Sequence, residues 1–312
     1  MKATRESYGE FLKKLDRENV YVLDADLSSS TKTIEYKNAN PDKFINCGIA
    51  EASMVSTAAG LASMGNLVFC SSFGAFLPGK VYDQIRQSIA YNDTNVKICS
   101  THNGISPGED GPTHQMLEDV ALMRAMPNMR VFVPSDDIST KSILNLLASD
   151  KKPAYVRLSR KKTREIYKEE DFKAFYLGSS YTHGMGTDIC IITNGDVLEI
   201  ALDAKEMLEK DGISVRVLDM YSVKPIDKEN IIKAGNECKN ILVVENHTKF
   251  GGLYSAVCEV LAESLPKKVY SIAINTFGKS GKEDEIYRFF GLSKENIYNK
   301  SKSIIRGEFI EE

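Results

Sequence analysis

The sequence predicts an α/β protein with two doubly wound domains, each a mostly parallel sheet covered by helices on both faces. Short apolar runs alternate with longer helical segments from about residue 20 to residue 158, a pattern typical of parallel sheets with crossover helices. The alternation restarts near residue 189, after a charge-dense stretch. At 312 residues, the chain is long enough for two domains of ordinary size.

The first domain is expected to span residues 1–165 and to open with a helix, because Tyr8, Phe11, Leu12 and Leu15 have helical spacing. Its apolar runs predict strands at residues 20–23, 67–70, 96–100, 129–133 and 155–158. Helices are predicted between them at residues 50–64, 80–91, 116–126 and 138–148. The helix at 50–64 is rich in Ala, Ser and Met and is expected to be buried.

The second, smaller domain is expected at residues 187–312. The charged stretch from Arg160 to Phe172 predicts a solvated connection, with the linker itself at residues 166–186. The predicted strands of the second domain cover residues 189–193, 215–218, 241–245 and 269–274. Its predicted helices cover residues 197–210, 253–265 and 283–290.

Composition excludes several classes of function. Apolar residues make up 42% and charged residues 27% of the chain, and the formal net charge is −3, so no electrostatic case exists for nucleic acid or an anionic membrane. No apolar run approaches the ~20 residues that span a bilayer, and the polar N-terminus has no signal-peptide core, so a cytoplasmic location is expected. The six cysteines form no CxxC pair and are expected to be reduced, mostly buried thiols without a metal.

Four polar clusters follow predicted strands. In open parallel sheets, ligands bind where the carboxyl ends of the strands meet. A polar residue after a strand is also common as a turn or helix cap, so each cluster alone is weak evidence. Together they predict one site at one sheet edge. The clusters are residues 26–30, 71–76, 102–114 and 157–160.

The most informative stretch is the loop from Gly108 to Gln115, which reads GEDGPTHQ. Two of the four histidines, His102 and His114, lie in or just before it. Glycine and proline allow sharp, rigid turns that hold acids and imidazoles in position. A polar surface loop with incidental histidines is the alternative interpretation.

The order of residues in this loop is distinctive. The pattern STH-x5-GEDGPTHQ, followed by a helix and MPNMRVFVPSD, resembles the pyrimidine-binding domain of transketolase. Over nearly its whole length, the chain is similar to the C-terminal half of that enzyme, which some bacteria and archaea divide into two chains. The resemblance implies a subunit of a thiamine-diphosphate-dependent transketolase, which moves a two-carbon ketol unit from a ketose phosphate to an aldose phosphate in the pentose phosphate pathway.

Related enzymes share this architecture, and a subunit of one of them is the second interpretation. Beta subunits of 2-oxo-acid dehydrogenases lack the DGPTH core, and deoxyxylulose-phosphate synthases keep it but do not usually have a histidine at the position of His102. A third alternative is a non-catalytic paralogue with a binding or regulatory role. The presence of Glu51, His102 and His114 argues against that alternative.

The resemblance implies roles on the cofactor side of the site. Glu51 opens an otherwise apolar helix, where a first-turn acid also suits the helix dipole; in the family this glutamate is catalytic and faces N1′ of the aminopyrimidine. Phe76 is expected to stack on that ring and Phe73 to line it, although core packing is the default for both. Asp26 matches an acid near the cofactor. Some relatives carry a further aromatic where this chain has Gly79.

On the substrate side, His102 and His114 match histidines that contact the donor sugar and move protons during catalysis. Asp110 is expected to bind a substrate hydroxyl. A sugar phosphate is expected to bind Arg5, Ser30 and Arg160, since the guanidinium fork pairs with phosphate oxygens.

One family motif is missing. Related enzymes hold Mg²⁺ and the cofactor's diphosphate through GDG and a later Asn, but Gly195-Asp196 is followed by Val197. An N-terminal partner subunit is therefore expected to supply both, in a heterotetramer with a dimer of this chain at its centre. The helix at 50–64 and the loops bearing Phe76 and His114 are the expected contact surfaces. The Glu245-Asn246-His247 segment is expected at a subunit boundary, and His183 and His247 have no assigned role.

Overall fold

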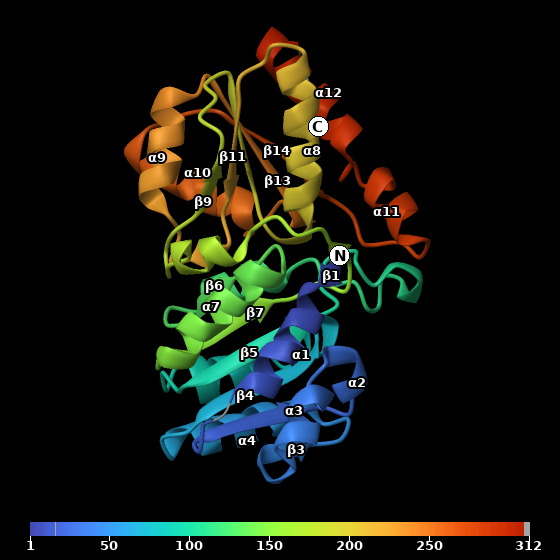
Figure 1. Ribbon diagram of the computed structural model, residues 1–312, viewed down its shortest axis with the longest axis vertical. Helices are drawn as coiled ribbons and strands as arrows, with labels where there is room; N and C mark the ends of the chain where they lie inside the picture. Colours follow the sequence, from blue (N-terminus) through green and yellow to red (C-terminus); the bar gives the residue numbers. More distant parts are fainter. Residues whose placement is uncertain (16, 309–312) are drawn as a thin grey trace.

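The computed structural model describes residues 1–15 and 17–308 as two stacked α/β domains (Figure 1). The first domain is built on a seven-stranded sheet with the order β12-β6-β7-β5-β4-β2-β3. Its strands are β2 (Val20–Asp24), β3 (Phe44–Asn46), β4 (Leu67–Phe73), β5 (Val96–Thr101), β6 (Arg130–Phe132), β7 (Ala154–Arg157) and β12 (Ser222–Lys224). All neighbouring pairs are parallel except β12 with β6.

Helices cover both faces of this sheet. On one face, α1 (Thr4–Lys14), α3 (Ile34–Ala39) and α7 (Asp137–Ser149) pack over Val22 and Phe69. On the other, α4 (Glu51–Ser63), α6 (Asp119–Ala125) and the π-helix η3 (Ile85–Ala90) pack over Val68 and Cys70. Successive residues of a strand point to opposite faces, so a strand buried on both sides is a continuous apolar run.

Short elements connect these layers. A two-stranded antiparallel ribbon joins β1 (Lys2–Ala3) to β8 (Lys162–Thr163), which brings the chain start next to the end of the first domain. The remaining short elements are α2 (Ser28–Thr31), η1 (Pro41–Lys43), the π-helix η2 (Ala75–Gly79), α5 (Tyr82–Gln84), η4 (Gly108–Asp110) and η5 (Glu169–Ala174).

The second domain has a five-stranded sheet with the order β14-β13-β10-β11-β9, in which only β9 is antiparallel. Its strands are β9 (Tyr181–His183), β10 (Ile189–Thr193), β11 (Val215–Asp219), β13 (Asn240–Thr248) and β14 (Val269–Ile274). One face is covered by α8 (Leu198–Lys210) and α12 (Lys294–Arg306), the other by α9 (Lys228–Glu237) and α10 (Leu253–Ser264) (Figure 1). The short helices η6 (Gly195–Val197) and α11 (Glu283–Phe289) lie toward the first domain.

The two domains are joined more closely than a flexible linker would allow. Strand β12 lies in the second half of the chain, yet it pairs with β6 of the first sheet. One hydrophobic core also runs from α1 and α7 of the first domain to α8 and α12 of the second. Their relative placement is therefore fixed by packing as well as by the connecting chain.

The predicted α/β class with two parallel-sheet domains is confirmed, and the strands at 189–193 and 269–274 match in both bounds. The prediction missed β3, β9, β12, α9 and α12. Within the described part of the chain, all six cysteines are free and four are buried, and no helix is long and apolar enough to cross a bilayer.

Three local expectations were wrong. The segment 80–91 is not one α-helix, because its second half is the π-helix η3, in which the amide of Tyr91 bonds to the carbonyl of Arg86. Helix α4 is buried on one side only, with Ala52, Ser56 and Gly60 exposed. The charged stretch after Arg160 is not simply solvated, since its Lys161 and Arg164 pair with acids of α8.

Candidate active site

The predicted site residues gather at the carboxyl edge of the first sheet. Strand β2 has β3 on one side and β4 on the other, so the chain reverses its direction of winding beside β2. Open α/β sheets bind ligands at such a switch point. The loops after β2, β4 and β5 all end there, and they carry most of the candidate residues.

Four aromatic and imidazole rings form one cluster at this edge. The ring centres of Phe73 and His102 are 3.8 Å apart, and those of Phe73 and Phe76 are 5.8 Å apart at an interplanar angle of 19°. His114 meets Phe76 edge-on, with 5.4 Å between ring centres. The end of β4 and the loops after β4 and β5 therefore bring four rings together, with Phe76 and His114 half-buried and Phe73 and His102 buried behind them.

Arg5 connects this cluster to the loop after β2. Its Nη1 donates to the carbonyl of Ser30 at 3.0 Å and lies 3.1 Å from Nε2 of His102. Since an arginine N–H always donates, Nε2 accepts and the ring proton is on Nδ1, 2.9 Å from Oγ1 of Thr101. Burial and the charges of Arg5 and Arg160 lower the pKa of His102 from 6.5 to about 3, so His102 is neutral at physiological pH.

Asp110 and Arg160 form an exposed pair at the outer end of the same edge. Nη1 of Arg160 lies 3.1 Å from Oδ2 of Asp110 and donates to the carbonyl of Pro107 at 3.0 Å. Both side chains are more than two-fifths exposed. They are thus within reach of a ligand, and an exposed pair of this kind exchanges partners at low cost.

Glu51 begins α4 and is 3% exposed. Lys80, one residue past the π-helix η2, places its Nζ 2.8 Å from Oε2 of Glu51. Within residues 1–15 and 17–308, Lys80 is the one side chain that pairs with this carboxylate. Sequence reasoning missed Lys80, because nothing in Gly79-Lys80 distinguishes it from any surface lysine.

The π-helical turn of η2 brings Lys80 to this position. Pro78 has no N–H to donate, and the amide of Gly79 bonds five residues back to the carbonyl of Gly74 at 3.4 Å, which widens the turn. A Cβ at Gly79 would lie 3.3 Å from Cε of Met116. Met116 therefore occupies the space next to the position where some relatives have an aromatic ring.

Asp26 lies at the edge of the site and has a left-handed backbone, with φ of 64°. Nδ2 of Asn46 donates to its carboxylate at 2.9 Å. Asp24, which the sequence reasoning passed over, is fully buried and accepts hydrogen bonds from Thr31 and Thr33 and from the amide of Leu27. It fixes the loop that carries Asp26 and Ser30.

The arrangement fits the pyrimidine half of thiamine diphosphate. It offers a buried carboxylate, Glu51, paired with a lysine that reaches in from the surface, and a half-buried ring, Phe76, on the adjoining loop. No group of three or more histidine, cysteine or acidic side chains among the described residues is placed to hold a metal.

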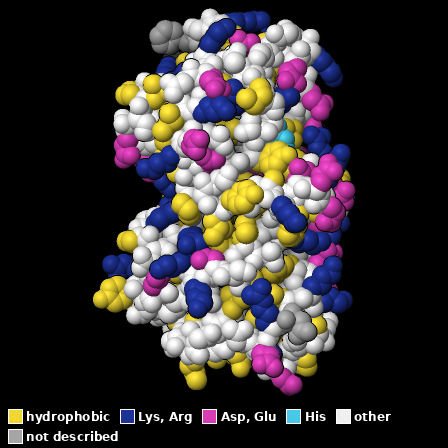
Figure 2. Space-filling model, turned by 60° about the vertical axis from the view of Figure 1, so that its left-hand side comes forward, with side chains coloured by type: hydrophobic (Ala, Val, Ile, Leu, Met, Phe, Trp, Pro, Cys, Tyr) yellow, Lys and Arg dark blue, Asp and Glu magenta, His cyan; other side chains and the backbone are white. Residues whose placement is uncertain are grey.

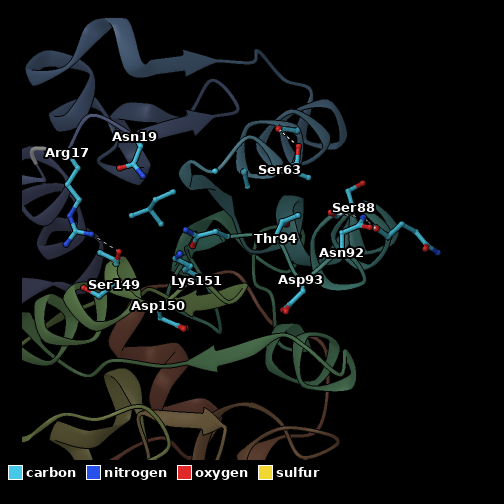
Figure 3. Close-up of a pocket in the computed structure, with 18 residues that line it drawn as sticks. Arg17, Asn19, Ser63, Ser88, Asn92, Asp93, Thr94, Ser149, Asp150 and Lys151 are labelled. Atoms are coloured by element: carbon cyan, nitrogen blue, oxygen red, sulfur yellow. Dashed lines mark hydrogen bonds between the residues drawn. The ribbon is translucent and has the colours of Figure 1, made fainter.

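A cavity of about 1010 Å³ lies at the opposite edge of the same sheet, near the amino ends of the strands (Figure 3). Polar side chains line it, among them Arg17, Asn19, Asn92, Asp93 and Lys151. None of the predicted site residues belongs to it. The predicted site residues therefore lie at the other end of the sheet, on loops rather than in this cavity.

Known proteins share both halves of this arrangement. The family model described as the pyrimidine-binding domain of transketolase matches residues 1–165, and that of the transketolase C-terminal domain matches residues 178–297. The chain therefore has the domain order of the thiamine-diphosphate-dependent enzymes that transfer ketol units. It belongs to the transketolase family.

Individual relatives define which part of transketolase it resembles. The chain is 45% identical over 300 residues to a protein described as a transketolase C-terminal section of Methanocaldococcus jannaschii, covering 95% of this chain and 94% of that one. It is 35% identical over 309 residues to one of the subunits of the apulose-4-phosphate transketolase of Phocaeicola vulgatus, covering 98% of both. Human transketolase is 37% identical over 310 residues, covering 97% of this chain but 49% of the human enzyme. The chain thus spans about half of the animal transketolases.

A solved structure agrees with this assignment. A split-gene transketolase described as an inactive β4 tetramer superposes with a TM-score of 0.91 at 38% identity, covering 98% of this chain and 99% of that one. Over its whole length, the chain accordingly corresponds to the C-terminal half of a transketolase, the half that this split-gene relative carries as a separate chain.

Proposed function

We propose that this chain provides the pyrimidine-facing and sugar-facing half of a transketolase that transfers a two-carbon ketol unit from a ketose phosphate to an aldose phosphate. The main support for this proposal is one observation. Glu51, the four-ring cluster and the Asp110–Arg160 pair lie at the same edge of the first sheet. Each group matches one requirement of that reaction.

Glu51 acts on the cofactor side. When bound, thiamine diphosphate supplies a nucleophilic thiazolium carbon. The Glu51 carboxyl group would share a proton with N1′ of the pyrimidine and so would help to activate that carbon. Phe76 provides the stacking surface and Asp26 stands at the rim. Because Glu51 is buried, its contact with the cofactor would be shielded from bulk water.

His102 and His114 act on the sugar side. A neutral His102, held by Arg5 and Thr101, is rigid and oriented for hydrogen bonds to sugar hydroxyls. His114 lies half-buried on the adjoining loop and is positioned to exchange protons with the substrate. Asp110 binds a hydroxyl, while Arg5, Ser30 and Arg160 hold the phosphate.

A partner subunit completes the enzyme. We assign the diphosphate and Mg²⁺ site to an N-terminal chain that covers the exposed side of α4, with two copies of each chain in a heterotetramer. Hydrophobic side chains also gather along the middle of one face of the molecule (Figure 2). The β4 tetramer of the split-gene relative supports self-association of this chain. From the likeness to the family, we also propose that the enzyme acts in the cytoplasm, in the pentose phosphate pathway.

The test is reconstitution. The chain is mixed with a candidate N-terminal subunit, thiamine diphosphate and Mg²⁺, and transfer is measured for a panel of ketose and aldose phosphates. The panel includes apulose 4-phosphate, because the Phocaeicola vulgatus relative is named for it. Activity is expected only with both subunits. Normal turnover by this chain alone, or no transfer with any phosphorylated sugar, would overturn the proposal.

A further inference from the structure

We infer that the second domain positions the sugar-binding groups, through Asn246, Asp196, Tyr287 and Ser280, and so sets the spacing between the hydroxyl-binding loop and the phosphate-binding arginine. The inference rests on the proposed function, in which His102, Asp110 and His114 meet the sugar and Arg160 meets its phosphate. Three separate contacts between the domains carry it.

The first contact holds the start of the hydroxyl-binding loop, residues 102–116. Oδ1 of Asn246, at the end of β13, accepts from the amide of Ile105 at 3.0 Å. A Cβ at Gly104 would lie 2.4 Å from that same oxygen, so only glycine fits there. Asn246 is 2% exposed. The expected subunit-boundary segment Glu245-Asn246-His247 thus lies, within this chain, at the boundary between the two domains.

The second contact holds the middle and end of the loop. Oγ of Ser280 donates to the carbonyl of Glu109 at 2.6 Å, and Nε2 of Gln115 donates to the carbonyl of Lys279 at 2.9 Å. A Cβ at Gly278 would lie 1.8 Å from Oε1 of Gln115. The segment after β14 therefore contacts the loop both before Asp110 and after His114.

The third contact holds the segment that bears Arg160. Oδ2 of Asp196 accepts from Oγ of Ser159 at 2.8 Å, and the same Oγ accepts from the amide of Lys161 at 3.0 Å. The residues on both sides of Arg160 are thus attached to one carboxylate of the second domain. Asp196 is 5% exposed, which shields these bonds from competing water.

These contacts form one network. The hydroxyl of Tyr287 donates to Oδ2 of Asp196 at 2.6 Å, and Nδ2 of Asn246 donates to that hydroxyl at 3.0 Å. The bonds therefore run from Ile105 through Asn246 to Asp196 and on to Ser159. Asn246 reaches Asp196 by way of Tyr287 and also directly, with its Nδ2 3.3 Å from both carboxylate oxygens. A shift of either end moves the phosphate-binding Arg160 relative to the loop.

The consequence concerns specificity. A ketose phosphate must span the distance from the histidines to Arg160. The network fixes that distance and so selects phosphorylated donors by their length. A donor without a phosphate does not engage Arg160 and is insensitive to the spacing. This difference separates a positioning role from a general effect on folding.

The experiment uses the reconstituted complex with Tyr287→Phe and a matched control, Tyr298→Phe. Tyr298 is also a C-terminal-domain tyrosine, but its hydroxyl bonds Asp211, remote from the network. Tyr287→Phe is expected to raise KM for a ketose phosphate roughly 2- to 10-fold, the effect of one lost hydrogen bond. The kcat value, the Kd for thiamine diphosphate and KM for a non-phosphorylated ketose are expected to stay unchanged, as are all values for Tyr298→Phe.

Ser280→Ala provides a second variant at an exposed contact, in case Tyr287→Phe fails to fold. It is expected to raise KM for the ketose phosphate in the same direction. Equal rises for phosphorylated and non-phosphorylated donors, or no change in either variant, would overturn the positioning role. An inactive wild-type complex would instead overturn the proposed function, and this inference with it.

Discussion

The ammonium of Lys80 lies 2.8 Å from the carboxylate of Glu51, with the two side chains 57% and 4% exposed. A lysine that reaches in from the surface therefore pairs with the buried acid at the start of α4. If Glu51 shares a proton with a pyrimidine nitrogen, Lys80 competes with the cofactor for the same carboxylate group.

Lys80→Met is therefore expected to tighten thiamine diphosphate binding to the reconstituted complex. The methionine keeps most of the chain length but removes the competing charge. Because Lys80 is more than half exposed, the gain is modest, roughly 2- to 5-fold in Kd. Calorimetric titration of the cofactor measures it, with Lys80→Arg as the charge-preserving control that should bind like wild type. Weaker binding by Lys80→Met would show that the lysine helps to hold the cofactor.

Glu51→Gln is expected to keep the assembly intact and to lose ~10²–10⁴-fold of the activity, the usual contribution of a general acid–base group. The amide nearly preserves the shape of the side chain but cannot exchange a proton with N1′. Hydrogen–deuterium exchange at the thiazolium carbon of bound cofactor should slow in parallel. Unchanged exchange would mean that Glu51 serves only as a first-turn acid of α4.

The sequence predicted much of this site because its residues follow strands. Parallel strands place their carboxyl ends together, so clusters after β2, β4 and β5 had to meet at one edge. The contact of Lys80 with Glu51 was not predictable in this way, since it depends on the π-helical turn that contains Pro78. Regular α-helical spacing of residues 75–80 would have placed Lys80 elsewhere on the surface.

Long-range pairings were equally hidden. Residues 222–224 form a short run whose partner, β6, lies about a third of the chain away, and periodicity carries no information on such distant partners. Asn246 was recognisable only as part of a recurrent segment. Its contact with the amide of Ile105 depends on the packing of one domain against the other. The exact domain boundaries and the roles of the site residues remain predictions.

The buried titratable groups predict opposing effects of pH on stability. Burial raises the pKa of Asp219 from 3.8 to about 7, so the folded chain holds a proton that the unfolded chain loses. The stabilisation from this group is present below pH 3.8 and is lost as pH rises toward 7. Burial lowers the pKa of His183 and His247 from 6.5 to about 4. The unfolded chain takes up those protons first, so this contribution declines as pH falls from 6.5 to about 4.

Asp219→Asn isolates the first effect. The amide cannot titrate, and its oxygen can still accept from the hydroxyl of Tyr167, which donates to Asp219 at 2.7 Å in the native protein. The Tm of the variant relative to wild type is therefore expected to rise between about pH 5 and about pH 8. Thermal unfolding across that range measures the difference. A constant difference would show that Asp219 is ionised throughout the range in the folded chain.

The exposed side of α4 is the surface on which we expect the N-terminal subunit to bind. Ala52, Ser56 and Gly60 lie there in the open, next to the buried Glu51, and small side chains permit close approach of a second helix. Ala52→Arg is expected to weaken binding of the N-terminal subunit by tenfold or more, about 1.4 kcal/mol, because the long cation lies where the shared site must close. Ala39→Arg, an equally exposed change on α3 at the opposite face of the sheet, is the matched control.

Light scattering of each variant with and without the N-terminal chain measures the assembly, and thermal unfolding checks that both variants fold. Stable interfaces bury ~1,200–2,000 Å² or more, so a long cation at the centre of the contact is expected to disturb it. A loss of the complex with Ala52→Arg but not with Ala39→Arg places the partner on α4. If both variants assemble like wild type, the partner approaches from another side, and Glu51 cannot lie in a site shared between the two subunits.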